Sequence, residues 1–182
     1  MTRLQASFLR GLVPAAQRVA ARYGVPASVV LAQAILESNW GRSRLARAAK
    51  NLFGLKAVSR HTDSITLPTT EYDRQGRPRI VGARFAAYAC LDDCLADYGR
   101  LLAFAPRYGP ARAVADDPIA FAEQLEACGY ATDPGYGKKL AGLICRHNLT
   151  RFDGVSPSPA SAPPAAAERE PRRGGKVRQM ES

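Results

Sequence analysis

The sequence changes its hydrophobic period in the middle of the chain, and this change restricts the possible folds. Residues 64–72 (SITLPTTEY) and 79–85 (RIVGARF) are rich in Thr, Ile, Val and aromatic residues, and the turn-forming cluster DRQGRP (73–78) separates them. The pattern predicts one β-hairpin. A two-stranded hairpin is at best marginally stable alone. We therefore expect an α+β fold, mostly α, in which a helical lobe packs beside a small hairpin lobe with a cleft between them.

The segments around the hairpin have the residue spacing of amphipathic helices. Helix-starting Pro and helix-ending Gly residues support this assignment. We expect helices over residues 4–23, 26–38, 43–50 and 91–104, and two more that begin at Pro118 and Pro134. After Phe152 the composition shifts to Pro, Ala, Ser and charged residues, which bury too little apolar surface to order a chain. We expect one domain over residues 1–153 and a disordered basic tail over residues 154–182.

The formal net charge is +10. Residues 155–182 carry five Lys or Arg and three Glu, so most of the excess belongs to the predicted domain. A basic surface suits a polyanion such as nucleic acid, anionic lipid or an acidic bacterial wall, and it also serves solubility. No nucleic-acid-binding motif is recognisable. No apolar run is long enough to span a membrane, and the N-terminal segment lacks the apolar core of a signal peptide.

The four cysteines are Cys90, Cys94, Cys128 and Cys145. Their even number is compatible with disulfides in an oxidising compartment, or with a structural role as free thiols. The chain has two histidines, and neither stands at a spacing that would complete a metal site with these cysteines. We expect no metal and no organic cofactor.

Glu37 is the first acidic residue after an almost entirely apolar helical segment (31–36), and Trp40, the only Trp in the chain, follows it. Burial, an apolar neighbour and the negative end of a helix all raise the pKa of a carboxyl group. Such a carboxyl can protonate a leaving-group oxygen near neutral pH. Gln33 lies one turn earlier on the same helix face and could orient the acid or the substrate. The alternative is an ordinary Glu at a frayed helix end.

Five sequence motifs occur in a characteristic order: LAQAILESNWGRSRLA, NLFGLKA, TTEY, ARFAAYACLDDCLADYGRLL and ACGYATDPGYGKKL. Together they resemble the glucosaminidase domain of glycoside hydrolase family 73, over about residues 8–150. The resemblance implies a lysozyme-like fold and hydrolysis of the β-1,4 bond between N-acetylglucosamine and N-acetylmuramic acid in peptidoglycan.

The resemblance also implies roles for individual residues. The family's general acid corresponds to Glu37, its second acidic residue to Glu71 on the hairpin, and a tyrosine that lines the site to Tyr130. Asp97 matches a family Asp for which a structural role is at least as well supported. Candidate substrate-binding residues, which would stack on sugar rings or line the cleft, are Gln33, Trp40, Asn51, Phe53, Tyr72 and Tyr136.

Two mechanisms are open at this point. Glu71 could activate water as a general base, or the substrate's own N-acetyl group could attack the anomeric carbon while Tyr130 steadies the intermediate. A muramidase or lytic transglycosylase of similar fold, and a non-catalytic wall-binding module, are the alternative functions. We expect a monomer that binds peptidoglycan glycan strands in the periplasm or outside the cell. It would arrive there without a cleaved signal peptide, through a secretion machine or by phage release.

Overall fold

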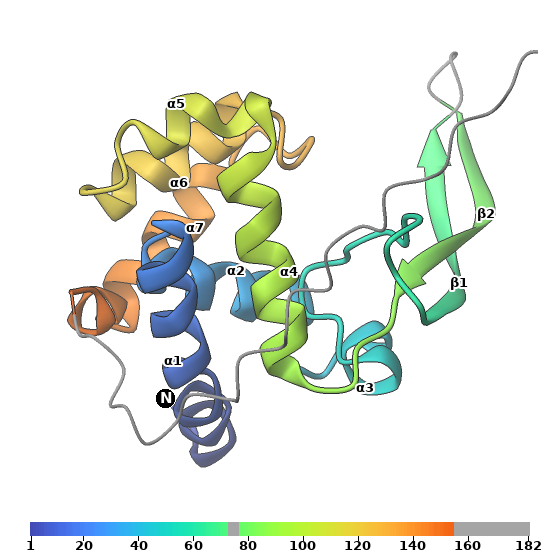
Figure 1. Cartoon of the computed structure of the whole chain (residues 1–182), viewed down its shortest axis with the longest axis horizontal. Helices are drawn as coiled ribbons and strands as arrows, with labels where there is room; N and C mark the ends of the chain where they lie inside the picture. The colour runs from blue at the N-terminus through green and yellow to red at the C-terminus, as the bar shows by residue number, and fades with distance from the viewer. Residues whose placement is uncertain (73–76, 155–182) are drawn as a thin grey trace, which may run out of the picture.

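The computed structural model describes residues 1–72 and 77–154, and for residues 70–72 and 78 it describes the backbone alone. Figure 1 shows a helical body and a β-hairpin that stands apart from it. The helical body contains α1 (Arg3–Tyr23), α2 (Ala27–Ser38), α4 (Leu91–Phe104), α5 (Gly109–Arg112), α6 (Pro118–Ala127) and α7 (Tyr136–Arg146), with the 3-10 turns η1 (Pro106–Tyr108) and η2 (Leu149–Phe152). The second lobe contains α3 (Arg44–Ala49), β1 (Ser64–Tyr72) and β2 (Pro78–Ala86). The predicted mostly helical fold with a small hairpin lobe is confirmed.

Helix α2 is the centre of the body. Every residue from Ala27 to Ile35 is buried, as expected for a helix that is apolar all round and therefore surrounded by other elements. Helices α1, α6 and α7 and the turn η2 pack against it. Its N-terminus is held from the far end of the domain, because the Ser28 backbone N–H donates to Oδ1 of Asp153 at 2.8 Å. The core of the domain therefore forms around the helix that ends at Glu37.

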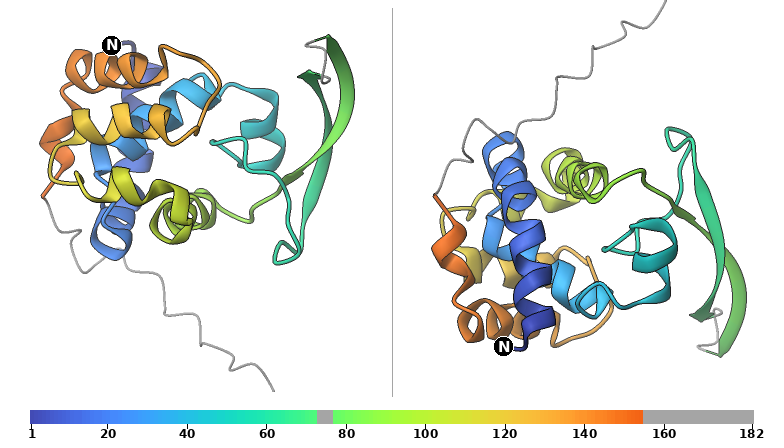
Figure 2. Two further views of the ribbon diagram at one scale, coloured as in Figure 1. Left: turned by 90° about the horizontal axis from the view of Figure 1, so that it is seen from above. Right: turned by 90° about the horizontal axis from the view of Figure 1, so that it is seen from below.

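The antiparallel strands β1 and β2 pair Ser64 with Ala86 and Tyr72 with Pro78. Backbone hydrogen bonds fasten the base of this hairpin to the loop after α3: Ala57 donates to the Arg84 carbonyl at 2.9 Å, and Ala86 donates to the Leu55 carbonyl at 3.0 Å. Both views in Figure 2 show α3 and this loop between the hairpin and the helical body. The hairpin thus joins the domain through its base, and its length extends away from the helices.

Two local features of the structure differ from the expectations. The last helix was expected to start at Pro134, but α7 begins at Tyr136 because Asp133 accepts the Gly135 backbone N–H at 3.0 Å and forms a turn first. The segment 106–112 forms η1 and α5, two short elements that the hydrophobic pattern did not indicate. Helix α1 runs through Pro14 without a break. The expected tail lies almost entirely outside the described residues.

The four cysteines are all free thiols. Cys94 is buried on α4, and its Sγ accepts the Leu52 backbone N–H at 3.4 Å. Burial raises the pKa of this thiol to about 12. Among the described residues, none of the helices is both long and apolar enough to cross a membrane.

Candidate active site

Glu37 lies in the last turn of α2, where the helix ends abruptly. Ser38 is the last residue of the helix. The three residues after it, Asn39, Trp40 and Gly41, have positive φ angles of 49°, 60° and 72°. The Gly41 backbone N–H donates to Oγ of Ser38 at 2.7 Å and closes this turn. The chain therefore turns away from α2 directly after Ser38. Glu37 reaches the surface as a residue, although its helix is otherwise mostly buried and its carboxyl group is partly buried.

The carboxyl group of Glu37 has one protein partner among the described residues. The hydroxyl of Tyr136 donates to Oε1 of Glu37 at 2.6 Å. Tyr136 is the first residue of α7 and is only 4% exposed. Tyr136 was expected to line the cleft or bind substrate; the structure places its hydroxyl on the acid itself, and this contact was not predicted.

The surroundings of Glu37 favour the protonated form of its carboxyl group. Burial of the carboxyl group raises the pKa of Glu37, and the hydrogen bond from Tyr136 offsets part of that increase. No basic side chain of the described chain forms an ion pair with Glu37, so no positive partner holds the group ionised. A carboxyl with a raised pKa and an exposed edge is suited to protonate an oxygen of a bound molecule.

Gln33 is fully buried one turn before Glu37. Its Nε2 donates to the Tyr136 hydroxyl oxygen at 2.7 Å, and its Oε1 accepts from the hydroxyl of Tyr98 on α4. The expectation that Gln33 orients the acid agrees with this placement, although Gln33 acts through Tyr136 and does not touch Glu37 directly. Its complete burial leaves no surface for a substrate.

Phe53, in the NLFG loop that follows α3, packs against Tyr98. Its ring stacks on Tyr98 with 3.9 Å between the centroids and 14° between the planes, and it is 4% exposed. The expected contact of Phe53 with a sugar ring does not fit this burial. The loop instead fixes the position of the Tyr98 ring.

Tyr130 lies beside the acid. Its ring stacks on Tyr136 with 5.5 Å between the centroids and 22° between the planes. Burial raises the pKa of Tyr130 well above its ordinary value, and the nearby charge of Glu37 adds to this increase. The hydroxyl of Tyr130 therefore stays protonated at every physiological pH and can act only as a neutral hydrogen-bonding group.

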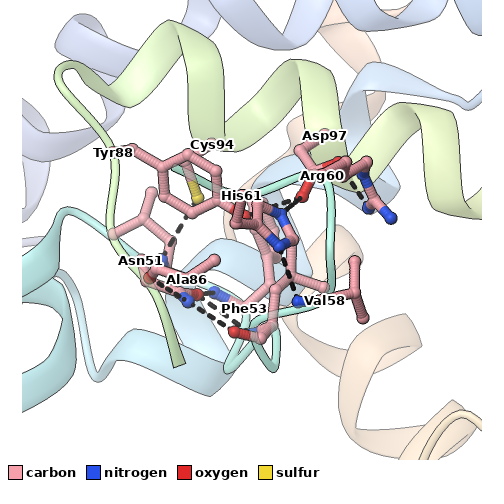
Figure 3. Close-up of polar contacts among 11 residues, drawn as sticks. Asn51, Phe53, Val58, Arg60, His61, Ala86, Tyr88, Cys94 and Asp97 are labelled. Carbon is pink, nitrogen blue, oxygen red and sulfur yellow. Dashed lines mark hydrogen bonds and ion pairs between the residues drawn. The ribbon is translucent and has the colours of Figure 1, made fainter. Parts of the chain in front are cut away.

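Two other expected binding residues have roles inside the protein. Asn51 is 1% exposed; its Nδ2 donates to the carbonyls of Leu55 and Ala86, both at 2.9 Å, as Figure 3 shows for Ala86. The expected contact of Asn51 with substrate does not fit this placement, because Asn51 ties the loop to the end of β2. The ring of Trp40 contacts Phe8 and His147, with centroids 6.0 and 5.1 Å apart.

Glu71 and Tyr72 lie at the far end of β1, opposite Arg79 and Pro78. Their side chains lie outside the described part of the structure, so the expected roles of Glu71 in catalysis and of Tyr72 in substrate binding remain predictions. Glu71 lies on the hairpin lobe and Glu37 on the helical body. Any joint action of the two residues requires a substrate that touches both lobes.

Asp97 on α4 joins the two lobes, and Figure 3 shows the donors that surround it. Its Oδ2 accepts from Nε2 of His61 and from the Tyr88 hydroxyl, each at 2.8 Å, and its Oδ1 accepts from Arg60 at 2.7 Å. Burial would raise the pKa of Asp97, but these three donors outweigh burial and hold the pKa below its ordinary value. This geometry favours the structural role for Asp97.

Tyr98 is the site residue that the sequence reasoning missed. It occupies one position of the apolar stripe of α4, with Leu91, Leu95 and Leu102, and such a stripe is typical of residues that pack in a core. A signal was available, because the hydroxyl of a buried Tyr needs a hydrogen-bonding partner. Nothing in the local sequence identifies that partner, which lies 65 residues earlier on α2.

The chain is similar to several known proteins. A family model described as mannosyl-glycoprotein endo-beta-N-acetylglucosaminidase matches residues 13–149. The exo-glucosaminidase LytG of Bacillus subtilis is 33% identical over 159 residues, which is 85% of this chain and 55% of LytG. The peptidoglycan hydrolase FlgJ of Escherichia coli K12 is 38% identical over 143 residues, which is 76% of this chain and 45% of FlgJ. The chain thus spans about half the length of the curated relatives it matches.

A solved structure supports the same comparison. The catalytic domain of the autolysin Auto from Listeria monocytogenes superposes with a TM-score of 0.75 at 33% sequence identity. The superposition covers 84% of this chain and 89% of that domain. The matched part of this chain is therefore about the size of one catalytic domain.

Proposed function

The chain belongs to the glucosaminidase family, and on that premise we propose that it hydrolyses the β-1,4 bond between N-acetylglucosamine and N-acetylmuramic acid in peptidoglycan. Glu37 is the general acid. The observation that carries the proposal is its placement: a partly buried carboxyl, on a residue that reaches the surface at the end of a buried helix, with a raised pKa and a neutral tyrosine as its partner. Relatives whose names describe peptidoglycan hydrolysis and glucosaminidase activity support the choice of substrate.

The first chemical step uses Glu37 in its protonated form. The O–H bond of the carboxyl breaks, the proton moves to the glycosidic oxygen, and the bond from that oxygen to the anomeric carbon breaks with its electron pair on the oxygen. The sugar gains oxocarbenium character, and the carboxyl becomes a carboxylate. The hydrogen bond from Tyr136 then stabilises the new negative charge, because a hydrogen bond to a charged acceptor is stronger than one to a neutral acceptor.

The second step has two forms. Glu71 removes a proton from water that attacks the anomeric carbon, or the N-acetyl oxygen of the substrate attacks it and water opens the resulting ring. Tyr130, a neutral donor beside Glu37, is suited to support the second form. The first form uses residues of this chain and water, and the second also uses the N-acetyl group of the substrate.

The charge of the protein agrees with an acidic wall polymer as the partner. The formal net charge is +10, and a cationic surface concentrates an anionic polymer near the site with a strength that falls as salt is added. The glycan strands of peptidoglycan lie outside the cytoplasmic membrane, so we place the activity in the periplasm or outside the cell.

The test is digestion of purified cell wall, followed by reduction and mass spectrometry of the fragments. The wild type is expected to create new reducing ends on N-acetylglucosamine, and Glu37→Gln is expected to create none. Glu123→Gln, a change of the same kind at an exposed position of α6, is the control and should digest the wall as the wild type does. Reducing or anhydro ends on muramic acid would overturn the bond assignment, and normal digestion by Glu37→Gln would overturn the assignment of the acid.

A further inference from the structure

Three hydrogen bonds connect the interior of α4 to the proposed acid. Tyr98 donates to Oε1 of Gln33, Nε2 of Gln33 donates to the Tyr136 oxygen at 2.7 Å, and Tyr136 donates to Oε1 of Glu37 at 2.6 Å. Tyr98 and Gln33 are fully buried and Tyr136 is 4% exposed. All three bonds point in the same direction, toward the carboxyl group. We call this series the Tyr98–Glu37 chain.

The common direction follows from the orientation of the Gln33 amide. A tyrosine hydroxyl has one proton, and the amide of Gln33 has a donor end and an acceptor end. Because Tyr98 donates to Oε1 of Gln33, the donor end of the amide must face Tyr136. The Tyr136 oxygen then accepts from Gln33, and its own single proton is free to point at Glu37.

The reverse orientation of Gln33 would change the chemistry at the acid. Tyr136 would then donate its proton to Oε1 of Gln33 and present a lone pair to Glu37. Glu37 would place its acid proton on Oε1, toward Tyr136 and away from any substrate. The orientation of one buried amide therefore decides which oxygen of Glu37 carries the proton.

We propose that Gln33 and Tyr98 are positioning residues which fix the direction of the Tyr136–Glu37 hydrogen bond and thereby place the acid proton of Glu37 on Oε2. This inference rests on the proposed function of Glu37 as the general acid. Oε1 accepts the proton of Tyr136 and cannot carry a second one in the same position. Oε2 has no protein partner among the described residues and is the oxygen available to a glycosidic oxygen.

The Tyr98–Glu37 chain also acts after the proton has left. Hydrogen bonds arranged in series polarise one another, so each donor strengthens the next. The negative charge that forms on Glu37 is then met by a donor already in place. Removal of an early member of the chain should therefore weaken the last bond, although Tyr98 and Gln33 touch neither Glu37 nor substrate.

The experiment uses Tyr98→Phe, which keeps the ring against Phe53 and removes the hydroxyl, and Gln33→Met, which keeps the length of the side chain. The pKa of Glu37 is read from carboxyl 13C resonances of the labelled protein, with Glu37→Gln to assign the signal. Both variants are expected to raise the pKa of Glu37 by about half a unit or more, because the bond from Tyr136 to the carboxylate is weakened. The alkaline limb of the pH–rate profile should move upward by the same amount.

Tyr108→Phe is the matched control. Tyr108 is also fully buried, and its hydroxyl accepts from Arg107 and has no part in the Tyr98–Glu37 chain. This variant should leave the titration of Glu37 unchanged. A merely structural loss of a buried hydroxyl would affect both tyrosine variants alike.

The double variant Gln33→Met/Tyr98→Phe tests the order of the chain and protects against misfolding, because it leaves neither buried partner unpaired. Tyr98 acts only through Gln33, so the double variant should shift the pKa no further than Gln33→Met does alone. A wild-type titration of Glu37 in folded Gln33→Met and in the double variant would overturn the proposal. Failure of the wild type to cut peptidoglycan would overturn the proposed function. It would not affect the measured effect of Gln33 and Tyr98 on the titration of Glu37.

Discussion

The hydroxyl of Tyr136 lies 2.6 Å from Oε1 of Glu37, although the two residues are 99 positions apart in the chain. Tyr136→Phe removes this donor and keeps the ring stacked on Tyr130. We expect kcat/KM to fall by roughly tenfold to a hundredfold, because a hydrogen bond to a charged group contributes about 1.5–3 kcal/mol. The alkaline limb of the pH–rate profile should also move to higher pH, since that bond lowers the pKa of Glu37. An unchanged profile would show that Tyr136 does not act on the acid.

The raised pKa of Glu37 predicts a cost in stability at neutral pH. The folded state holds the carboxyl proton to higher pH than the unfolded chain does, so between the two pKa values the unfolded chain binds fewer protons. The free energy of unfolding must then fall as the pH rises through this interval. Glu37→Gln removes the titration, so we expect its Tm to exceed that of the wild type at pH 7.

The pH dependence of this difference is the sharper measurement. The gap in Tm between Glu37→Gln and the wild type should shrink as the pH falls to about 3, below the ordinary pKa of a Glu, where the carboxyl is mostly protonated in both states. Glu123→Gln, at an exposed position, should show no such gap at any pH. A Glu37→Gln variant less stable than the wild type at pH 7 would contradict the raised pKa.

The anomeric form of the first product distinguishes the two forms of the second step, one with Glu71 as general base and one with attack by the N-acetyl group. Direct attack by water with Glu71 as general base inverts the anomeric carbon and gives the α-anomer, whereas attack by the N-acetyl group retains it and gives the β-anomer. Proton NMR of a digest recorded before mutarotation reads this outcome. If the product shows inversion, Glu71→Gln should lose activity about as severely as Glu37→Gln. If it shows retention, Tyr130→Phe should lose more activity than Glu71→Gln.

Asp97 is expected to hold the loop that carries the hairpin. Asp97→Asn removes the negative charge of the carboxylate that accepts hydrogen bonds from His61, Tyr88 and Arg60. We expect this change to destabilise the domain by roughly 2–3 kcal/mol. The pKa of Asp97 is lowered in the folded state, so its stabilisation is present above the pKa of the unfolded chain and is lost as the pH falls through the folded value. The difference between variant and wild type should therefore be largest near neutral pH.

A second aspartate on the same helix provides the comparison. Asp92 forms a salt bridge with Arg18 at 2.6 Å, but its side chain is 44% exposed. Asp92→Asn should cost less than about 1 kcal/mol, as exposed ion pairs do. Denaturant unfolding of both variants measures the difference, and equal losses would remove the special role of Asp97.

The local parts of the fold were predictable from the sequence. The hairpin was expected at residues 64–72 and 79–85 and is found at 64–72 and 78–86, because alternating β-branched residues and a turn cluster are properties of the segment itself. The end of α2 near Ser38 was predictable for the same reason. The start of α7 was placed two residues early, since a Pro after Asp fits both a helix start and the turn that Asp133 forms.

The contacts inside the site were harder to predict because they join distant segments. Gln33 could be placed on the face of Glu37 from helix spacing alone, but its partners Tyr98 and Tyr136 lie 65 and 103 residues away. Asn51 belongs to a sequence motif of the family and was expected to contact the substrate. Its side-chain amide instead donates hydrogen bonds to two backbone carbonyls. Sequence spacing indicates which residues share a helix face, and it carries no information on which faces meet.

The packing of α4 on α1 places Tyr98 in the site, and the neighbouring Gly99 makes this close approach possible. A Cβ at Gly99 would lie 2.5 Å from Tyr23 and 2.8 Å from Val19, both on α1. We expect Gly99→Ala to lower stability by about 1–3 kcal/mol, because the two helices must move apart and overpacking outweighs the gain in helix propensity.

Gly142→Ala in α7 provides the matched control for this change. Gly142 is an exposed helical glycine, and a Cβ there would meet nothing within 4 Å. It should stabilise the domain by about 0.5–1 kcal/mol through helix propensity alone. Thermal unfolding of the two variants should therefore shift Tm in opposite directions. Since Gly99 adjoins Tyr98, Gly99→Ala should also raise the pKa of Glu37, and an equal rise in Gly142→Ala would show that the change at Glu37 does not pass through α4.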